Sequence, residues 1–197
     1  MRKISIMLEE VGLPYTAHIV EKQSNGQLAD NFTVINPNAT VPAMVDRDTG
    51  ITLFESGAIL YYLAEKTRKL LPLDLHGRAE VVKWLMFEAA NMCPTMIELY
   101  HYLFTDSGEI PDFVLQRYKD KLARYCAIID KQLDGREYLC GDYSIPDIAI
   151  YPWTTILEDI AEINLNDYQN MKIWAAAIGN RYDGLSGRHF IVRTAPA

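Results

Sequence analysis

The sequence predicts a mixed α/β domain followed by an all-helical domain, on three observations. Two short extended runs, residues 43–46 and 51–54, flank a turn that ends in Gly50, as in a β-hairpin. Apolar residues recur at helical spacing before and after that hairpin. Beyond Gly77 the chain keeps helical periodicity and shows no strand-like alternation of useful length. We therefore expect one domain over residues 1–68 and a second over residues 76–197.

Composition excludes several classes of protein and partner. The chain of 197 residues is 49% hydrophobic and 23% charged, which is ordinary for a globular protein. A net charge of -7 without a basic cluster argues against a nucleic-acid partner. No run approaches the roughly 18 apolar residues of a membrane span, and no secretion signal opens the chain. Three cysteines without a CxxC pair and four histidines without ligand spacing predict reduced thiols, a cytoplasmic location and no metal.

The first domain is predicted element by element. A helix over residues 3–11 ends at Gly12, and residues 15–20 are expected to form a strand. A surface loop and a short helix at 29–35 precede the hairpin. A helix then begins at Glu55-Ser56-Gly57, with Ile59, Leu60 and Leu63 on one face. The resulting order, α-β-α-β-β-α, is that of a thioredoxin-like domain without its first strand.

The second domain begins after a linker within residues 66–77. A long helix over residues 78–104 contains Pro94, which we expect to kink it or to divide it in two. Another helix is predicted over residues 113–133.

The centre of the second domain is predicted from a capping box. Ser144 and Asp147 have the spacing of such a box, and the helix that follows, 148–160, is apolar all round at its start. It should therefore be the central buried helix of this domain. A last helix is expected over residues 171–182, before a tail. Its inward face is predicted to carry Ile173, Trp174, Ala177 and Ile178.

One stretch combines the features of a ligand site. The pair Val41-Pro42 interrupts an extended run just before the hairpin. The pair Glu55-Ser56 stands at a helix start, where free N–H groups and a short hydroxyl favour a carboxylate.

These motifs resemble the cytosolic glutathione transferase family. The order of Val41-Pro42, hairpin and Glu55-Ser56 matches its glutathione-binding half, and residues 139–147 (LCGDYSIPD) resemble its folding box. Residues 3–14 and 54–67 resemble the bacterial nu-class or disulfide-bond oxidoreductase branch. That branch includes glutathione-dependent disulfide reductases and relatives of a yeast nitrogen regulator. The resemblance implies glutathione as cosubstrate, a homodimer, and a small electrophile or a disulfide as second substrate.

The resemblance also implies roles for individual residues. The backbone of Val41, before a cis-Pro42, would receive the cysteinyl part of glutathione. Glu55 and Ser56 would hold the amino group and the carboxylate of its γ-glutamyl end. Gln27 would reach the peptide backbone, the alternative being a solvated loop glutamine. Arg117 would point at the ligand from the helical domain, although a surface cation on an exposed helix face is the preferred interpretation.

The family's first strand and the catalytic loop after it have no counterpart here, because Met1-Arg2-Lys3 already belong to the first helix. Either the start is placed late or the chain is truncated, or this is a divergent, non-catalytic protein with a rebuilt sheet. No catalytic residue is therefore assigned. We expect a glutathione transferase-like enzyme that uses the glutathione thiol for conjugation to electrophiles or for disulfide reduction. The alternative is a non-catalytic binding or regulatory protein of the same fold.

Overall fold

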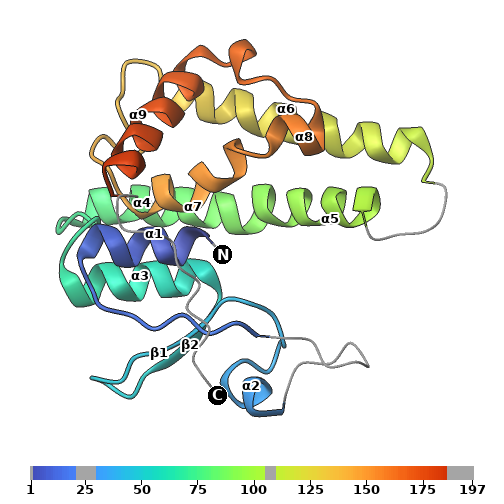
Figure 1. Cartoon of the computed structure of the whole chain (residues 1–197). Helices are drawn as coiled ribbons and strands as arrows, with labels where there is room; N and C mark the ends of the chain where they lie inside the picture. The colour runs from blue at the N-terminus through green and yellow to red at the C-terminus, as the bar shows by residue number, and fades with distance from the viewer. Residues whose placement is uncertain (1, 21–29, 105–109, 186–197) are drawn as a thin grey trace. The chain divides into compact units, whose positions relative to one another are not determined.

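The computed structural model describes residues 2–20, 30–104 and 110–185 (Figure 1). The chain divides into two compact units, and the division falls between Lys69 and Leu70. The first unit has a thioredoxin-like arrangement with a small sheet, and the second is helical. None of the helices in the described ranges is long and apolar enough to cross a membrane. Within the same ranges, no three His, Cys, Asp or Glu side chains are grouped to hold a metal ion.

The first unit packs three helices with a two-stranded antiparallel sheet. Its elements are α1 (Arg2–Val11), α2 (Asp30–Ile35), β1 (Ala43–Val45), β2 (Thr52–Phe54) and α3 (Ser56–Thr67). The predicted helices, hairpin and turn are thereby confirmed, with shifts of one or two residues at their ends.

The core of the first unit lies between α1 and α3, which pack against each other. Ile6 and Met7 of α1 are buried, as are the predicted Ile59, Leu60 and Leu63 of α3. Each of these side chains is at most 2% exposed, so α3 is held in place by a dry apolar contact.

Helix α1 ends as its sequence predicts. Gly12 has a φ of 76°, which glycine adopts readily because it has no Cβ to clash with the backbone. Its amide donates to the carbonyl of Glu9 (3.1 Å), and the amide of Leu13 donates to that of Leu8 (3.0 Å). These two bonds make a Schellman motif, which satisfies carbonyls that a helix end otherwise leaves without a partner.

The strand expected at residues 15–20 is not formed. Residues 13–20 belong to no helix or strand, and the sheet of the described residues contains β1 and β2 alone. A strand needs a neighbour to pair its N–H and C=O groups, and the described part of the chain offers none here. The Tyr15 hydroxyl instead donates to Glu9 Oε1 at 3.2 Å.

The second unit consists of helices and turns. Its elements are α4 (Leu75–Phe87), a π-helical turn (Glu88–Met92), α5 (Cys93–Phe104), α6 (Asp112–Gln132), α7 (Ile145–Thr154), α8 (Leu157–Ala161), a 3₁₀ turn (Leu165–Asp167) and α9 (Gln169–Leu185). The long helix expected over residues 78–104 is divided where Pro94 was predicted to act. Proline has no N–H to donate to the preceding turn, and the chain accommodates it by widening to π geometry just before it.

Helix α7 is the central buried helix, as predicted. Ile145, Ile148, Ala149 and Ile150 have no exposed surface. The capping box of Ser144 and Asp147 is present. Asp147 is also fully buried, so the helix begins inside the core of the second unit.

Two details of the helical predictions are wrong. Helix α7 ends at Thr154, and α8 follows as a separate helix, because Pro152 cannot donate to the carbonyl of Ile148. Ile173 was expected to point inward, but it is 68% exposed. The buried face of α9 is set by Met171, Trp174 and Ile178, and a residue next to Trp174 lies about 100° away around the helix.

Candidate functional site

The register of the hairpin brings the two predicted ligand-binding pairs to one end of the sheet. Ala43 pairs with Phe54, the last pair of the hairpin, so Val41-Pro42 shortly before β1 and Glu55-Ser56 directly after β2 adjoin the same end of the sheet. The Val41–Pro42 peptide bond is cis. Val41 is 45% exposed, and its backbone makes no hydrogen bond within the described ranges.

The start of α3 leaves backbone donors without partners. The first bond of the helix runs from the Ile59 amide to the Glu55 carbonyl at 3.0 Å. The amides of Ser56, Gly57 and Ala58 therefore have no acceptor inside the helix, and no side chain caps them. The positive end of the helix dipole lies at the same place. This helix start can accept a carboxylate.

Glu55 has an unusual backbone conformation at this point. Its φ of 69° and ψ of 117° lie outside the regions that side-chain-bearing residues favour. The Glu55 side chain is exposed and that of Ser56 is half-buried. In the part of the chain that the structure describes, neither forms a hydrogen bond or an ion pair. Strained backbone next to unpaired polar groups is typical of ligand sites.

A buried asparagine, which the sequence analysis did not identify, shapes the loop before Val41. Asn36 is 1% exposed, and its side-chain amide donates to the Thr40 carbonyl. Its side-chain oxygen accepts from the Asn38 amide at 2.9 Å. The polar run Asn36-Pro37-Asn38 was the available signal, because Asn side chains readily bond to nearby backbone in turns. Asn36 thus fixes the conformation of the loop that precedes Val41.

A polar cluster, also missed, ties the far end of the hairpin to α3. The Lys66 ammonium pairs with the carboxylates of Asp46 and Asp48, and the Tyr62 hydroxyl donates to Asp46 Oδ2 at 2.7 Å. Thr49 and Tyr62 share a further hydroxyl contact of 2.9 Å. We call these five residues the turn cluster. The bond from Lys66 and then that from Tyr62 hold the pKa of Asp46 well below its ordinary value, while Asp46 raises the pKa of Lys66.

The two remaining residues of the predicted site are placed differently. Gln27 lies outside the described residues. Arg117 is on α6 of the second unit, where its side chain is exposed. Its role toward glutathione therefore stays a prediction.

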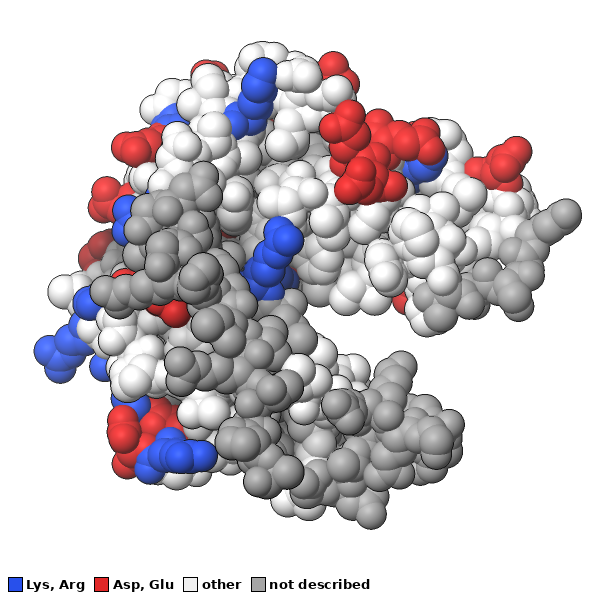
Figure 2. Space-filling model, in the orientation of Figure 1, with Lys and Arg blue, Asp and Glu red and all other residues white. Residues whose placement is uncertain are grey.

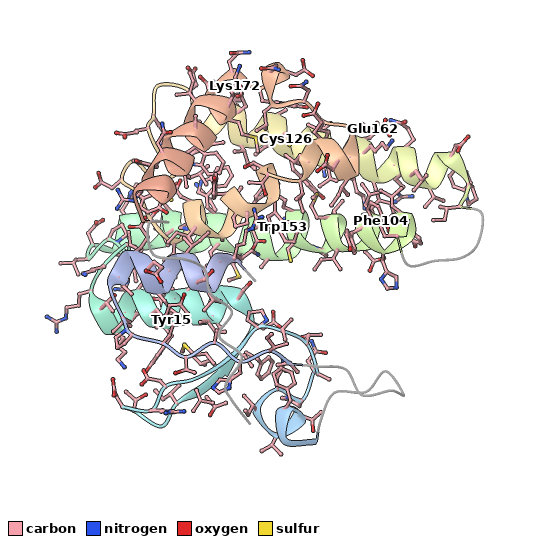
Figure 3. The ribbon with its side chains drawn as sticks, viewed as in Figure 1. Tyr15, Phe104, Cys126, Trp153, Glu162 and Lys172 are labelled. Atoms are coloured by element: carbon pink, nitrogen blue, oxygen red, sulfur yellow. The ribbon has the colours of Figure 1, made fainter. Side chains whose placement is uncertain are left out.

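Two cysteines of the second unit are poor nucleophiles. Cys126 lies among the helices of the second unit (Figure 3). Burial raises its pKa to about 12, and Asp130 adds to that shift. Burial likewise raises the pKa of Cys140 to about 11. The thiolate is the reactive form of cysteine, so neither side chain is prepared for thiol chemistry at neutral pH.

Comparison with family models covers both units. Residues 1–66 match the model "Glutathione S-transferase, N-terminal domain". Residues 92–181 match the model "Glutathione S-transferase, C-terminal domain". The two matches contain, respectively, the hairpin with the start of α3 and the capping box of α7.

Individual relatives agree with these models. The disulfide-bond oxidoreductase YfcG of Escherichia coli is 35% identical over 185 residues, 91% of this chain and 85% of its own length. The Protein URE2 of Debaryomyces hansenii is 31% identical over 157 residues, 76% of this chain and 51% of its own length. A solved glutathione transferase of Burkholderia graminis, with two glutathione molecules per subunit, is 36% identical with a TM-score of 0.85. That match covers 96% of this chain and 84% of the other. The chain belongs to the glutathione S-transferase family.

Proposed function

We propose that this chain binds glutathione at the end of the hairpin formed by Val41, Pro42, Glu55 and Ser56. The free backbone groups of Val41 pair with the peptide, as an added strand pairs with a sheet edge. The amides at the start of α3 and the Ser56 hydroxyl receive the γ-glutamyl carboxylate, and the Glu55 carboxylate receives the amino group. The observation that supports this assignment is the pairing of Ala43 with Phe54, which brings an open backbone and an uncapped helix start to the same end of the sheet.

The reaction we propose uses the thiol of glutathione itself. In disulfide reduction, a glutathione thiolate attacks one sulfur of the substrate, and the other sulfur leaves as a thiol. A second glutathione then attacks the mixed disulfide, so that glutathione disulfide and two substrate thiols result. The name of YfcG, a disulfide-bond oxidoreductase, supports this reaction, and so do the two glutathione molecules in the Burkholderia enzyme. Conjugation to a small electrophile uses the same nucleophile.

Gln27 and Arg117 complete the proposed glutathione contacts. The Gln27 amide would bond to the peptide backbone of the ligand. The Arg117 guanidinium would attract its carboxylates. Both roles come from the family resemblance and are separate from the contacts at the hairpin.

A double substitution tests the site. In Glu55→Ala with Ser56→Ala, glutathione loses two charge-assisted hydrogen bonds, and we expect its dissociation constant to rise about a hundredfold. Isothermal titration with reduced glutathione measures this change. Glu158→Ala, which removes one carboxylate from α8, serves as the control and should bind like the unmodified chain. Unchanged affinity in the double variant would refute the assignment.

The second candidate function is binding or regulation without turnover, and the solved Ure2p, 26% identical to this chain and in complex with glutathione, supports the binding part of it. It predicts a folded chain that neither conjugates an electrophile nor reduces a disulfide. Assays with 1-chloro-2,4-dinitrobenzene and with hydroxyethyl disulfide distinguish the candidates. Turnover of either substrate excludes this alternative.

We also propose that the chain forms a homodimer through the second unit. Exposed apolar side chains on α4 and α5 recur at helical spacing, and they are Val82, Met86, Ile97, Tyr100 and Phe104. Such a patch favours contact with a second copy. Size-exclusion chromatography with light scattering tests this, and a monomer at micromolar concentration would contradict it. None of the three cysteines, all among the described residues, is in a disulfide, which supports the expected cytoplasmic location.

A further inference from the structure

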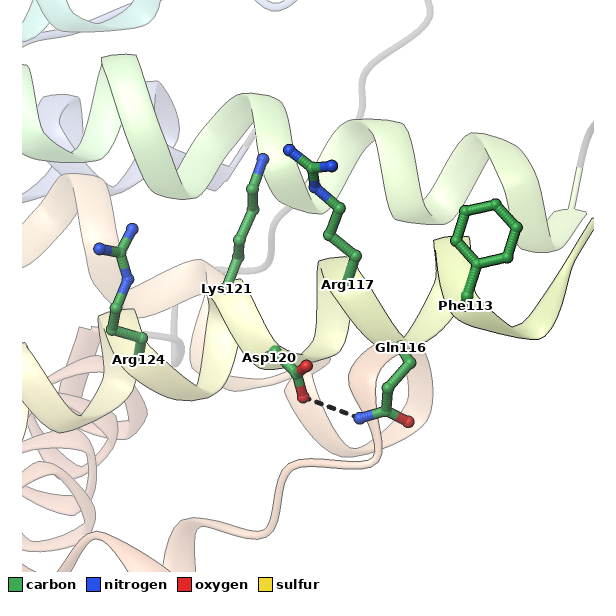
Figure 4. Close-up of a pocket in the computed structure, with 6 residues that line it drawn as sticks. All are labelled: Phe113, Gln116, Arg117, Asp120, Lys121 and Arg124. Carbon is green, nitrogen blue, oxygen red and sulfur yellow. Dashed lines mark hydrogen bonds between the residues drawn. The ribbon is translucent and has the colours of Figure 1, made fainter.

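One exposed face of α6 gathers three cations and an aromatic ring. Arg117, Lys121 and Arg124 follow one another at spacings of four and three residues, which places them on one side of a helix. Phe113, one turn before Arg117, is 74% exposed. Together with Gln116 and Asp120, these four residues line a shallow depression of about 460 Å³ that is widely open to solvent (Figure 4). We call Arg117, Lys121 and Arg124 the cationic row.

The cationic row has no carboxylate partner in the part of the chain that the structure describes. Within the described ranges, none of its three members forms an ion pair. The Asp120 carboxylate borders the same depression, but it points away from the cationic row and accepts from the Gln116 amide at 2.8 Å (Figure 4). Burial raises the pKa of the Tyr118 hydroxyl, and the negative charge of Glu98 on α5 adds to that shift.

Among the described residues, the acidic side chains on and just after α8 form no ion pair with the cationic row. Figure 2 shows acidic side chains gathered over this helix, which carries Glu158 and Asp159 and is followed by Glu162. Glu162 pairs with Lys119, a cation outside the row. In a chain with a net charge of -7, three neighbouring cations that form no ion pair among the described residues are a local exception. Like charges at these spacings destabilise a helix, so the arrangement favours an external anion.

Two members of the cationic row form cation–π contacts with tyrosine rings. The Lys121 ammonium lies 5.6 Å from the centre of the Tyr118 ring. The Arg124 guanidinium lies 5.2 Å from that of Tyr125, which is 5% exposed. Such cation–π contacts restrict the side chains while leaving their charge available. Restriction before binding lowers the entropy lost when a ligand is bound.

The dimensions of the face indicate the kind of ligand. With a helical rise of about 1.5 Å per residue, the cationic row extends over roughly 10 Å, and Phe113 lies about 6 Å beyond Arg117. Arginine forks suit phosphate oxygens, and an exposed ring suits a flat aromatic group. We propose that this face binds an extended small-molecule polyanion, with its phosphate groups on the cationic row and an aromatic group against Phe113.

The test separates this site from the glutathione site. Because Arg117 is also a proposed glutathione contact, the variant is Lys121→Gln with Arg124→Gln. Lys131→Gln removes a cation from the last turn of the same helix and is the matched control. The probes are ATP, inorganic tripolyphosphate and uncharged adenosine, titrated calorimetrically at low salt without added metal.

We expect ATP and tripolyphosphate to bind the unmodified chain and adenosine to bind weakly. The double variant should bind both anions at least tenfold more weakly and bind glutathione with unchanged affinity. Lys131→Gln should bind all of them like the unmodified chain. Phe113→Ala should lower the affinity for ATP at least fivefold and leave that for tripolyphosphate unchanged, as expected for a lost stacking contact. Absence of anion binding, or equal loss in the Lys131 control, would overturn the proposal. Equal effects of Phe113→Ala on both anions would overturn the aromatic contact.

Discussion

Helices α3 and α7 differ in whether the backbone N–H groups and cap residues at their N-termini have hydrogen-bond partners. At α7, Asp147 Oδ1 accepts from the Leu139 amide (3.0 Å) and the Trp174 indole (2.9 Å). Its other oxygen accepts from the Ser144 amide at 2.9 Å and from the Ser144 hydroxyl at 3.1 Å. At α3, Glu55 and Ser56 provide no side-chain cap. One helix start is saturated and buried, and the other is open.

This difference separates stability from binding. A saturated N-terminus contributes to the free energy of folding, because every donor and acceptor is satisfied before any ligand arrives. An open N-terminus forgoes that stabilisation and keeps its donors available for an anion. Substitutions at α7 should therefore change stability, and substitutions at α3 should change binding.

The largest effect is expected from Asp147→Ala. This change leaves the buried amide and indole donors without an acceptor, which should lower the free energy of unfolding by about 4 kcal/mol. Urea denaturation followed by tryptophan fluorescence measures the loss. Asp147→Asn keeps the shape and part of the bonding and should cost less. A loss below about 1 kcal/mol in Asp147→Ala would contradict the structural role of this carboxylate.

A smaller and opposite effect is expected from Glu55→Gly. Glycine adopts the φ of 69° without steric cost, so the free energy of unfolding should rise by about 1 kcal/mol. Loss of the carboxylate should weaken glutathione binding about tenfold. Denaturation and calorimetry on the same samples measure both effects.

Glu162 provides the matched control for Glu55→Gly. It has a φ of 57° at the end of α8, outside the proposed site. Glu162→Gly should therefore stabilise the chain and leave glutathione affinity unchanged, since its exposed pair with Lys119 contributes little. Equal loss of affinity in both variants would show that the backbone change, and not the carboxylate, is responsible.

The smallest effect is expected from Asp46→Asn in the turn cluster, and it depends on pH. The folded-state pKa of Asp46 is lowered, so its stabilising contribution is present above the unfolded pKa of about 4. The contribution is lost progressively as the pH falls from about 5 toward the folded pKa. The advantage of the unmodified chain over Asp46→Asn in urea midpoints should therefore be constant above about pH 5 and begin to shrink as the pH falls from about 5 to about 3.

Asp48→Asn is the control for this pH dependence. Asp48 shares Lys66 with Asp46, but its side chain is 83% exposed. Exposed pairs contribute little, so Asp48→Asn should follow the unmodified chain at every pH. A constant difference between Asp46→Asn and the unmodified chain across this range would exclude ionisation as the cause.

Local signals accounted for the elements that position the site. The Gly50 turn, the capping box of Ser144 and Asp147 and the interruption at Pro94 all appear where their residue types predict. Each depends on a few neighbouring residues, and that information is fully contained in a short stretch of sequence.

Features that depend on distant residues were missed. The strand expected at residues 15–20 needed a partner to pair with. The Asp46–Lys66 contact joins residues 20 positions apart, and no periodicity indicates which of several surface charges will meet. The exposure of Ile173 depended on which face of α9 the rest of the second unit covers. These outcomes are set by tertiary packing, which overrides local pattern.

The hairpin register has a consequence for tolerated changes in chain length. Insertions at the tip, between Asp46 and Ile51, leave the pairing of Ala43 with Phe54 intact and keep Val41-Pro42 and Glu55-Ser56 at the same end of the sheet. Deleting a single residue from either strand shifts that alignment and turns every following side chain to the opposite surface. Natural length variation among sequences with this hairpin should therefore be confined to its tip.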